Sequence, residues 1–116
     1  MGGTSGVKHD NGKPEWIYLP WAALEQVVKV QDYGAAKYSR ENWKQVENLE
    51  IRYLSAALRH ITAHARGENE DPESGLPHLA HAITSLLFVL EDKLDTPPKE
   101  VYKVPTFVEP GLEIPA

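Results

Sequence analysis

The 116-residue sequence contains no cysteine, which excludes disulfide bonds, thiolate nucleophiles and cysteine-based zinc sites. No apolar run approaches about 18 residues, so we expect no transmembrane helix, and the N-terminal residues lack the apolar stretch of a signal peptide. Positive charge is also scarce, because 12 Lys and Arg face 17 Asp and Glu and leave a net charge of −5. Nucleic-acid-binding proteins carry a basic face. We therefore expect a cytoplasmic protein that binds neither nucleic acid nor a membrane.

Histidine, in contrast, is clustered. The chain has five histidines, and four of them lie between residues 60 and 81. The fifth, His9, belongs to the N-terminal segment. The length suits one domain with one modest hydrophobic core. Because neutral histidine is the commonest transition-metal ligand, the cluster is the first candidate for a functional site.

Hydrophobic periodicity predicts an all-α protein with three helices, at residues 20–33, 46–66 and 76–94. Gly34 is expected to interrupt the first helix, and the polar segment 39–43 is expected to form a loop with Asn42 as a candidate cap. Gly67 provides a C-terminal stop for the second helix, and Pro77 suits the start of the third.

Apolar residues recur at spacings of three and four along the second and third helices, which predicts one buried stripe on each. The stripe of the second helix consists of Leu49, Tyr53, Leu54, Ala57, Leu58, Ile61 and Ala65. The stripe of the third helix consists of Leu79, Ile83, Leu86, Leu87, Leu90 and Leu94. Three helices bury a thin core and both stripes are wide, so we expect a homo-oligomer, either a dimer or a tetramer.

The chain divides into a helical part and a tail. We expect residues 1–94 to form a single helical domain that begins with an irregular basic arm at residues 1–19. Residues 95–116 hold five of the nine prolines and several apolar residues. An ordinary disordered linker has fewer apolar residues. We therefore expect an extended tail that packs on its own domain or on a neighbouring subunit.

The clustered histidines form pairs that each share one helix face. His60 and His64 are four residues apart, and His78 and His81 are three apart. If the second and third helices form an antiparallel hairpin, both pairs meet the acids of the 68–75 loop at one end. The spacing places the histidines beside the apolar stripes rather than within them.

Three of these histidines and the loop acids form a candidate metal site. Imidazole suits transition metals, and carboxylates can complete a mixed shell or orient the ligands. The candidate ligands are His60, His78 and His81, with one or more of Glu68, Asp71 and Glu73. His64 is the easiest of the four clustered histidines to interpret as a surface residue.

Basic residues near the cluster favour a phosphate-bearing substrate. Arg59 adjoins His60, while Lys13 and Lys37 lie in upstream segments that can fold over the hairpin. Candidate stacking surfaces for a nucleobase are Trp16, Tyr38 and Trp43. The sequence has no P-loop, GxGxxG or GxSxG motif, so activated water is the expected nucleophile.

Four segments of the sequence carry a family resemblance, namely KHDNGKP, LPWAALEQVVKVQDYGAAKY, ENW and RYLSAALRHITAHARGENEDPESGLPHLAHA. Together they resemble the phage-associated dATP/dGTP diphosphohydrolase N-terminal domain family. The resemblance covers residues 8–92 and is most specific from Arg59 to Ala82. It implies a MazG-like helical bundle with a central helical hairpin.

The resemblance also implies a reaction, in which water attacks the α-phosphate of dATP or dGTP and yields dNMP and pyrophosphate in a phage-infected bacterium. The catalytic residues would be Glu68, Asp71 and Glu73, with Glu68 as a candidate general base. The substrate-binding residues would be Lys13, Lys37, Asn42, Trp43 and Arg59. The metal-binding residues would be His60, His78, His81 and Glu73.

One departure from MazG-type enzymes leaves the cofactor open. Those enzymes hold Mg²⁺ with carboxylates on two helices, and imidazoles stand in the corresponding places here. Mg²⁺ prefers oxygen ligands, so either the loop acids hold Mg or Mn, or a softer metal such as Co, Ni, Zn or Fe binds. A third alternative is that no metal binds and hydrolysis is lost. The competing functions are a non-catalytic protein that sequesters a nucleotide or nucleotide signal, and an oligomeric scaffold with structural histidines.

Overall fold

The computed structural model of the protein describes residues 5–95. This range forms α-helices and short 3-10 helices without a β-strand, so the predicted all-α class is confirmed, while the finer prediction of a MazG-like bundle stays a prediction. The elements are η1 (Trp16–Tyr18), α1 (Trp21–Lys37), η2 (Asn42–Gln45), α2 (Leu49–Ala65) and α3 (His78–Asp95). Within residues 5–95 no helix is both long and apolar enough to cross a membrane. The predictions for the tail concern residues 96–116, which lie outside the described range.

Helix α1 runs through Gly34 and ends at Lys37, so the predicted break at Gly34 is wrong. Glycine costs a helix interior only about 1 kcal/mol relative to alanine, and the two alanines that follow are strong helix formers. The carbonyl of Gly34 also accepts a hydrogen bond from the backbone N–H of Tyr38 at 2.9 Å. The additional turn places Lys37 on the same helix face as Tyr33.

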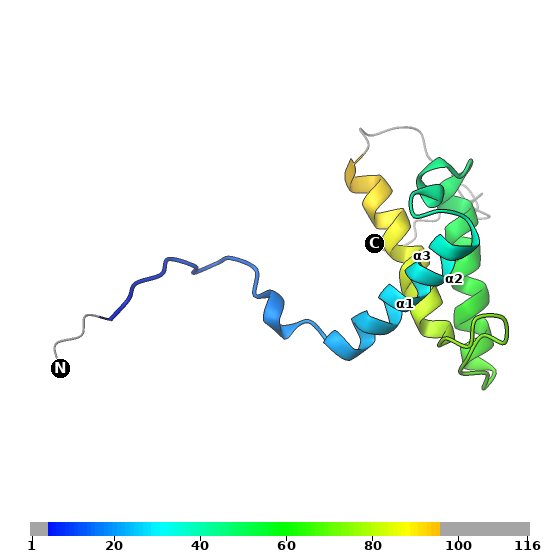
Figure 1. Cartoon of the computed structure of the whole chain (residues 1–116), viewed down its shortest axis with the longest axis horizontal. Coiled ribbons are helices and arrows are strands. Elements are labelled where there is room, and N and C mark those ends of the chain that lie inside the picture. The colour runs from blue at the N-terminus through cyan, green and yellow to red at the C-terminus, as the bar shows by residue number, and fades with distance from the viewer. Residues whose placement is uncertain (1–4, 96–116) are drawn as a thin grey trace, which may run out of the picture.

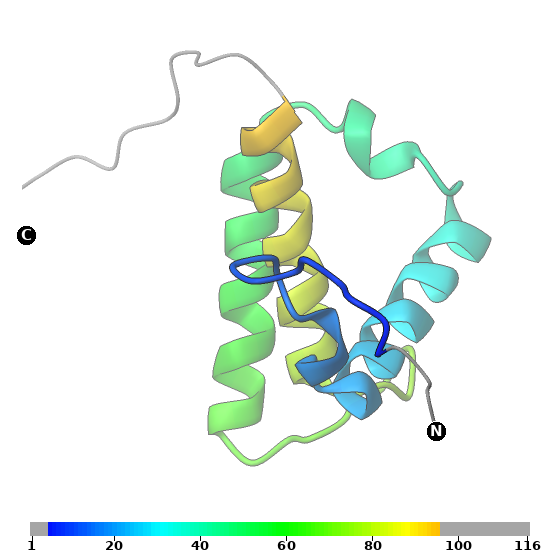
Figure 2. The same ribbon diagram turned by 90° about the vertical axis from the view of Figure 1, so that its left-hand side faces the viewer.

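Helices α2 and α3 form the predicted antiparallel hairpin, and α1 packs against α3 (Figures 1 and 2). Gly67 ends α2 as predicted, with φ at +99°, and its backbone N–H donates to the carbonyl of His64 at 2.9 Å. Asn42, the candidate cap, instead begins η2, which connects α1 to α2. The hairpin therefore has two opposite faces, and α1 covers one of them.

The loop between α2 and α3 is tied together by its own backbone. The N–H of Asp71 donates to the carbonyl of Leu76, and the N–H of His78 donates to the carbonyl of Asn69, both at 2.8 Å. Gly75 adopts the positive φ of +73° that this tight turn uses and that glycine tolerates best. These bonds hold the acidic loop against the first turn of α3.

Most residues of the two predicted stripes are exposed, so the prediction that they form the core is wrong for a single chain. All six stripe residues of α3 are exposed, with exposed fractions from 38% to 72%. Of the α2 stripe, Leu49 and Ala57 are buried and Tyr53 is half-buried. We call the exposed remainder the leucine face: Leu54, Leu58, Ile61, Ala65, Leu79, Ile83, Leu86, Leu87, Leu90 and Leu94.

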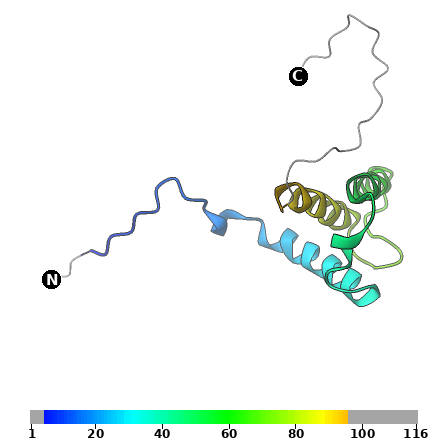
Figure 3. The same cartoon turned by 90° about the horizontal axis from the view of Figure 1, so that it is seen from above.

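The core lies on the side of the hairpin that α1 covers, and the view from above shows α1 alongside the hairpin (Figure 3). Most of its buried residues are small or polar, and α3 contacts both α2 and α1 there. They are Val27, Val30, Leu49, Ala57, Ala80, Ala82, His78, Thr84 and Ser85. His78 is 4% exposed. The expectation that the histidines lie beside the core is therefore wrong for His78, which is part of it.

Residues 5–20 extend away from the helices (Figures 1 and 3). The arm is irregular as predicted, apart from η1, and its side chains are exposed. Trp16 is 71% exposed and Tyr18 is 80% exposed. The arm therefore leaves the hairpin open and does not fold over it.

Candidate functional site

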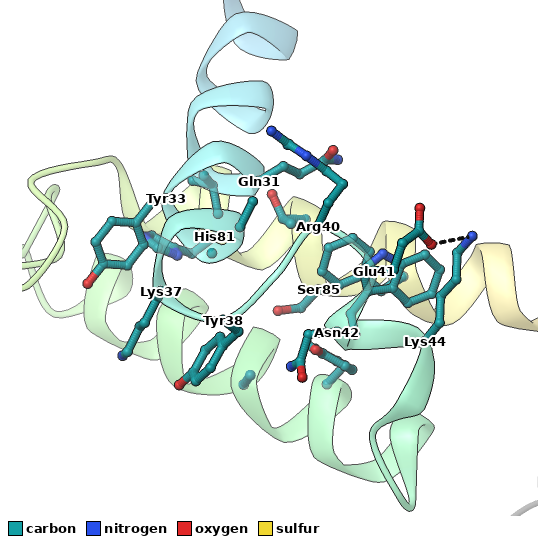
Figure 4. A pocket seen from close by; sticks show the side chains of 18 of the residues that line it. Gln31, Tyr33, Lys37, Tyr38, Arg40, Glu41, Asn42, Lys44, His81 and Ser85 are labelled. Carbon is teal, nitrogen blue, oxygen red and sulfur yellow. Dashed lines mark ion pairs between the residues drawn. The ribbon is translucent and has the colours of Figure 1, made fainter.

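A pocket of about 640 Å³ lies between α1, η2, α2 and α3 (Figure 4). Small-molecule sites commonly occupy about 300–1,000 Å³. Figure 4 shows Tyr33, Lys37 and His81 near one end of the pocket, and Glu41 and Lys44 near the other. We call these the histidine end and the aromatic end, because the side chains around them differ in chemistry.

At the histidine end, three side chains form a chain of hydrogen bonds. Oε1 of Glu68 lies 2.6 Å from Nε2 of His78, and Nδ1 of His78 lies 2.8 Å from Nδ1 of His60. A carboxylate oxygen accepts, so Nε2 of His78 donates to Glu68, and we assign Nδ1 of His60 as the donor and Nδ1 of His78 as the acceptor of the second bond. This assignment is inferred from the network. It leaves the lone pair of His60 on Nε2, for which residues 5–95 supply no hydrogen-bond partner.

His60 stacks on His81, with the ring centroids 4.5 Å apart and the ring planes 10° apart. Burial lowers the pKa of His60 below its ordinary value of 6.5, and the nearby His81 and His78 lower it further. Burial also lowers the pKa of His81. Both rings are therefore neutral at pH 7, as a proton acceptor or a metal ligand must be.

Ser74 connects His81 to Asp71. The Oγ atom of Ser74 lies 2.7 Å from Nε2 of His81, and the backbone N–H of Ser74 donates to Oδ2 of Asp71 at 3.3 Å. Burial by itself raises the pKa of Asp71, but the hydrogen bonds from Ser74 outweigh it and the pKa falls below its ordinary value. Asp71 therefore carries a negative charge 3.6 Å from Nε2 of His81.

Glu73 accepts two hydrogen bonds at the pocket wall, from Nζ of Lys37 at 2.7 Å and from the hydroxyl of Tyr33 at 2.8 Å. The bond from Lys37 lowers the pKa of Glu73 most, and the bond from Tyr33 lowers it further. The same bond from Lys37 to Glu73 raises the pKa of Lys37. A carboxylate with a lowered pKa is a weak base, so Glu73 is better suited to holding Lys37 than to abstracting a proton.

The aromatic end is built by η2, α2 and α3. Trp43 stacks on Phe88 with centroids 4.4 Å apart, and Tyr53 meets Phe88 edge-on at 5.3 Å. Phe88 follows His81 by seven residues, which corresponds to about 10 Å along a helix. Aromatic rings of this kind can stack on a nucleobase.

The structure brings together most of the predicted site residues. Those that line the pocket are Lys37, Asn42, Trp43, His60, Asp71, Glu73 and His81, together with the predicted stacking residue Tyr38. Glu68 and His78 lie behind the pocket and reach it through His60. Sequence reasoning missed Tyr33 and Phe88, which also line the pocket.

Several predicted residues lie elsewhere. Lys13 and Trp16 are exposed on the extended arm, and His64 does not line the pocket. Arg59 lies with Arg66 in a separate shallow hollow on α2. In sequence Arg59 adjoins His60, but successive helical residues point about 100° apart, which explains why they face different sides.

The predicted metal ligands already have other hydrogen-bond partners. His60 and His78 are bonded to each other, whereas His81 is bonded to Ser74 and Glu73 is bonded to Lys37 and Tyr33. Their mixture of nitrogen and oxygen donors would suit a first-row transition metal. Among residues 5–95, however, no three His, Asp or Glu side chains converge in an arrangement that could hold a metal ion. We therefore derive no catalytic step from a metal, and the metal site stays a prediction.

Comparisons with known proteins place this chain in a family. The model of the family described as "dATP/dGTP diphosphohydrolase, N-terminal" matches residues 3–100. A relative named dATP/dGTP diphosphohydrolase, from Salmonella phage PMBT28, is 36% identical over 86 residues. That match covers 73% of this chain and 29% of the relative, so this chain spans less than a third of its length. No solved structure matches.

The matched range includes every residue that lines the pocket as well as Glu68 and His78 behind it. The resemblance deduced from the motifs is thereby confirmed. The chain belongs to the dATP/dGTP diphosphohydrolase N-terminal family.

Proposed function

We propose that this domain binds a purine deoxynucleoside triphosphate and hydrolyses it to dNMP and pyrophosphate. The observation that carries the proposal is the division of one pocket into a histidine end with Lys37 and an aromatic end with Trp43. A nucleotide has the same two parts, a phosphate chain and a flat base. The name of the phage relative supports a purine as the base.

Cationic side chains commonly bind phosphate oxygens, and the basic side chains that line the pocket are all paired. Lys37 is paired with Glu73, Arg40 with Asp32 and Lys44 with Glu41. Exposed ion pairs of this kind add little to stability. We therefore infer that Lys37 transfers its hydrogen bond from Glu73 to a phosphate oxygen when the nucleotide binds.

His60 is the best-placed base in the pocket. As water attacks the α-phosphorus, a proton of the water passes to Nε2 of His60, and the bond from the α-phosphorus to the bridging oxygen breaks, so pyrophosphate leaves. Glu68 and His78 act as positioning residues, because they hold His60 in the tautomer whose Nε2 is unprotonated. This assignment moves the role of general base from Glu68, the sequence candidate, to His60.

A divalent metal is retained as a proposal for the nucleotide complex. Asp71 and Glu73 line the pocket, and Mg²⁺ is commonly bound by one or two carboxylates together with substrate phosphates. No step above depends on the metal. Elemental analysis of the purified protein, and the metal dependence of pyrophosphate release, test this part separately.

The reaction is tested by incubating the protein with each of the four dNTPs and with Mg, Mn, Co, Ni or Zn. Pyrophosphate and dNMP are followed by ion chromatography, and we expect release from dATP or dGTP. The His60→Ala variant should lose this activity, whereas His64→Ala, a matched change one turn further along α2, should retain it. Release of no pyrophosphate under any condition would contradict hydrolysis by this domain.

Nucleotide binding without hydrolysis is the second candidate. It is favoured by the 29% coverage of the phage relative, because binding and chemistry can be divided between parts of a longer protein. Isothermal calorimetry with each dNTP distinguishes the two. Binding of intact dATP or dGTP, without product, supports this second function.

A further inference from the structure

A row of three arginines, Arg52, Arg59 and Arg66, runs along α2. They recur at intervals of seven residues, which is nearly two helical turns, so their side chains follow one side of the helix about 10 Å apart. All three are exposed. None of the ion pairs found within residues 5–95 includes any of them. The row is therefore an exposed line of positive charge without a carboxylate partner in the described part of the chain.

Other basic side chains of the helical part are neutralised. Lys37, Arg40 and Lys44 at the pocket each form an ion pair with a carboxylate, and so does Lys93 in the last turn of α3. The chain contains 17 Asp and Glu against 12 Lys and Arg, so acidic side chains are available in excess. Arginines that stay unpaired in such a chain carry charge that can attract an anion.

Two of these arginines lie in the shallow hollow on α2, whose volume is about 430 Å³. Thr62 lies three residues after Arg59 and four before Arg66, so the hydroxyl stands between the two guanidinium groups on one helix face. The lining consists of two arginines, two hydroxyl side chains and two apolar side chains, namely Arg59, Arg66, Ser55, Thr62, Leu58 and Ala63. The hollow therefore presents several hydrogen-bond donors, and its lining includes no carboxylate.

This set of donors suits an anion with many oxygen atoms. A guanidinium group donates two parallel hydrogen bonds to a phosphate, and a hydroxyl can donate to a further oxygen. Both arginine side chains are long and can converge over Thr62. An anion with two adjoining phosphoryl groups, one at each guanidinium, matches this arrangement better than a single phosphate does.

The surroundings favour a small anion over a nucleic acid. The phosphates of a nucleic acid would extend beyond the arginine row onto a chain of net charge −5, and that charge repels a long polyanion. A small anion responds mainly to the nearest charges. Helix α2 ends at Ala65, and the negative end of its dipole opposes an anion there. The attraction must therefore come from the guanidinium groups themselves.

We propose that the hollow around Arg59, Thr62 and Arg66 binds a small anion with two adjoining phosphoryl groups, either free pyrophosphate or the phosphate chain of a nucleotide. This site is separate from the pocket, because no residue lines both. It does not depend on hydrolysis in the pocket.

The first test titrates the ¹⁵N-labelled full-length chain with sodium pyrophosphate at constant ionic strength and without divalent metal. The backbone amide signals of Thr62 and Arg66 should shift and saturate, with a dissociation constant of about 1 mM or lower. Arg66→Gln should weaken binding about tenfold or more, because charge-assisted hydrogen bonds are lost. Lys29→Gln removes the same charge at an exposed position of α1 outside the hollow and the pocket, and should leave the constant unchanged.

The second test distinguishes the two sources of the anion by repeating the titration with dADP. A lower dissociation constant for dADP than for pyrophosphate, measured at the same two amides, identifies a nucleotide as the ligand. Equal constants identify the diphosphate group alone, and both results support the site. The proposal is overturned if the amides of Thr62 and Arg66 do not respond up to about 10 mM pyrophosphate. Equal weakening by Lys29→Gln, or tighter binding of a short DNA duplex to this row, would also overturn it.

Discussion

The two faces of the α2–α3 hairpin differ in a way that hydrophobicity alone does not anticipate. Adjacent residues of α3 show the contrast, because His78 is 4% exposed and Leu79 is 43% exposed. The face with small and polar side chains is buried beneath α1 and forms the pocket, while the face with leucines is open. The stronger apolar pattern is therefore exposed in the single chain, and the weaker, polar pattern marks the interior of the domain and its candidate site.

The largest expected effect on activity comes from replacing each of these two neighbours with alanine in turn. His78→Ala removes the link between Glu68 and His60 and should reduce pyrophosphate release about 100-fold, near the lower end of the general-base contribution. Leu79→Ala, one residue further and on the other face, should leave the turnover of folded protein nearly unchanged. Steady-state kinetics of both variants, with folding checked by circular dichroism, measure the difference. An equal loss of pyrophosphate release in both variants would contradict the assignment of the candidate site to the pocket face alone.

The second prediction concerns packing on the pocket side. Ala57 is 2% exposed, so Ala57→Leu overfills a close helix contact and should reduce the free energy of unfolding by about 1–3 kcal/mol. Ala23→Leu makes the same chemical change at an exposed position of α1, where about 0.5 kcal/mol is expected. Urea denaturation of both variants measures this. Equal stability would show that the pocket side is loosely packed.

The third prediction separates the two ends of the pocket. Lys37→Ala removes the cation at the histidine end and should raise KM for the nucleotide about tenfold, as expected for loss of a charge-assisted hydrogen bond. Lys44 lies 5.7 Å from the ring centroid of Trp43 at the aromatic end, and Lys44→Ala should raise KM less. If the Lys44 variant has the larger effect, the phosphates bind at the aromatic end.

The smallest expected effect is a pH dependence of stability that belongs to the pocket side. His60 and His81 have pKa values below the ordinary 6.5 in the folded protein. At a pH between the folded and the unfolded pKa of each histidine, the unfolded chain therefore binds more protons than the folded protein. The free energy of unfolding should therefore decrease as the pH falls below about 6.5. The lowered pKa values of Asp71 and Glu73 affect stability at lower pH, because the ordinary pKa values of these groups are 3.8 and 4.5.

Urea denaturation at about pH 7.5 and about pH 5.5 covers the histidine window. The His81→Asn variant should show a smaller decrease than the parent protein. The leucine face has no ionisable side chain and contributes nothing to this dependence. An unchanged slope in the variant would mean that His81 is as easily protonated in the folded protein as in the unfolded chain.

The sequence was sufficient to predict the helices and the meeting of the histidines. Periodicity located α2 and α3, and Gly67 and Pro77 marked the turn between them, so closure of the hairpin brought His60 to His78. It could not predict that α1 continues through Gly34. A single glycine costs less free energy than the packing of one more helical turn gains.

Burial was predicted on the wrong side because periodicity identifies an apolar face but not the surface that covers it. A leucine stripe looks the same whether it faces the interior of one chain or another molecule. The hydrogen bond between Tyr33 and Glu73 could not be predicted from the sequence either, since it depends on how α1 crosses the acidic loop. The i to i+4 spacing of Tyr33 and Lys37 was an available signal, and it becomes meaningful once the helix is known to reach Lys37.

The loop between α2 and α3 has a consequence for the evolution of the family. Surface loops ordinarily tolerate insertions and deletions. Here Glu68 precedes the loop and its partner His78 follows it, and Oε1 of Glu68 lies 2.6 Å from Nε2 of His78. Adding or removing one residue between Asn69 and Leu76 would shift the acid out of reach of the imidazole. Relatives that share this arrangement are therefore expected to keep the length of this loop constant.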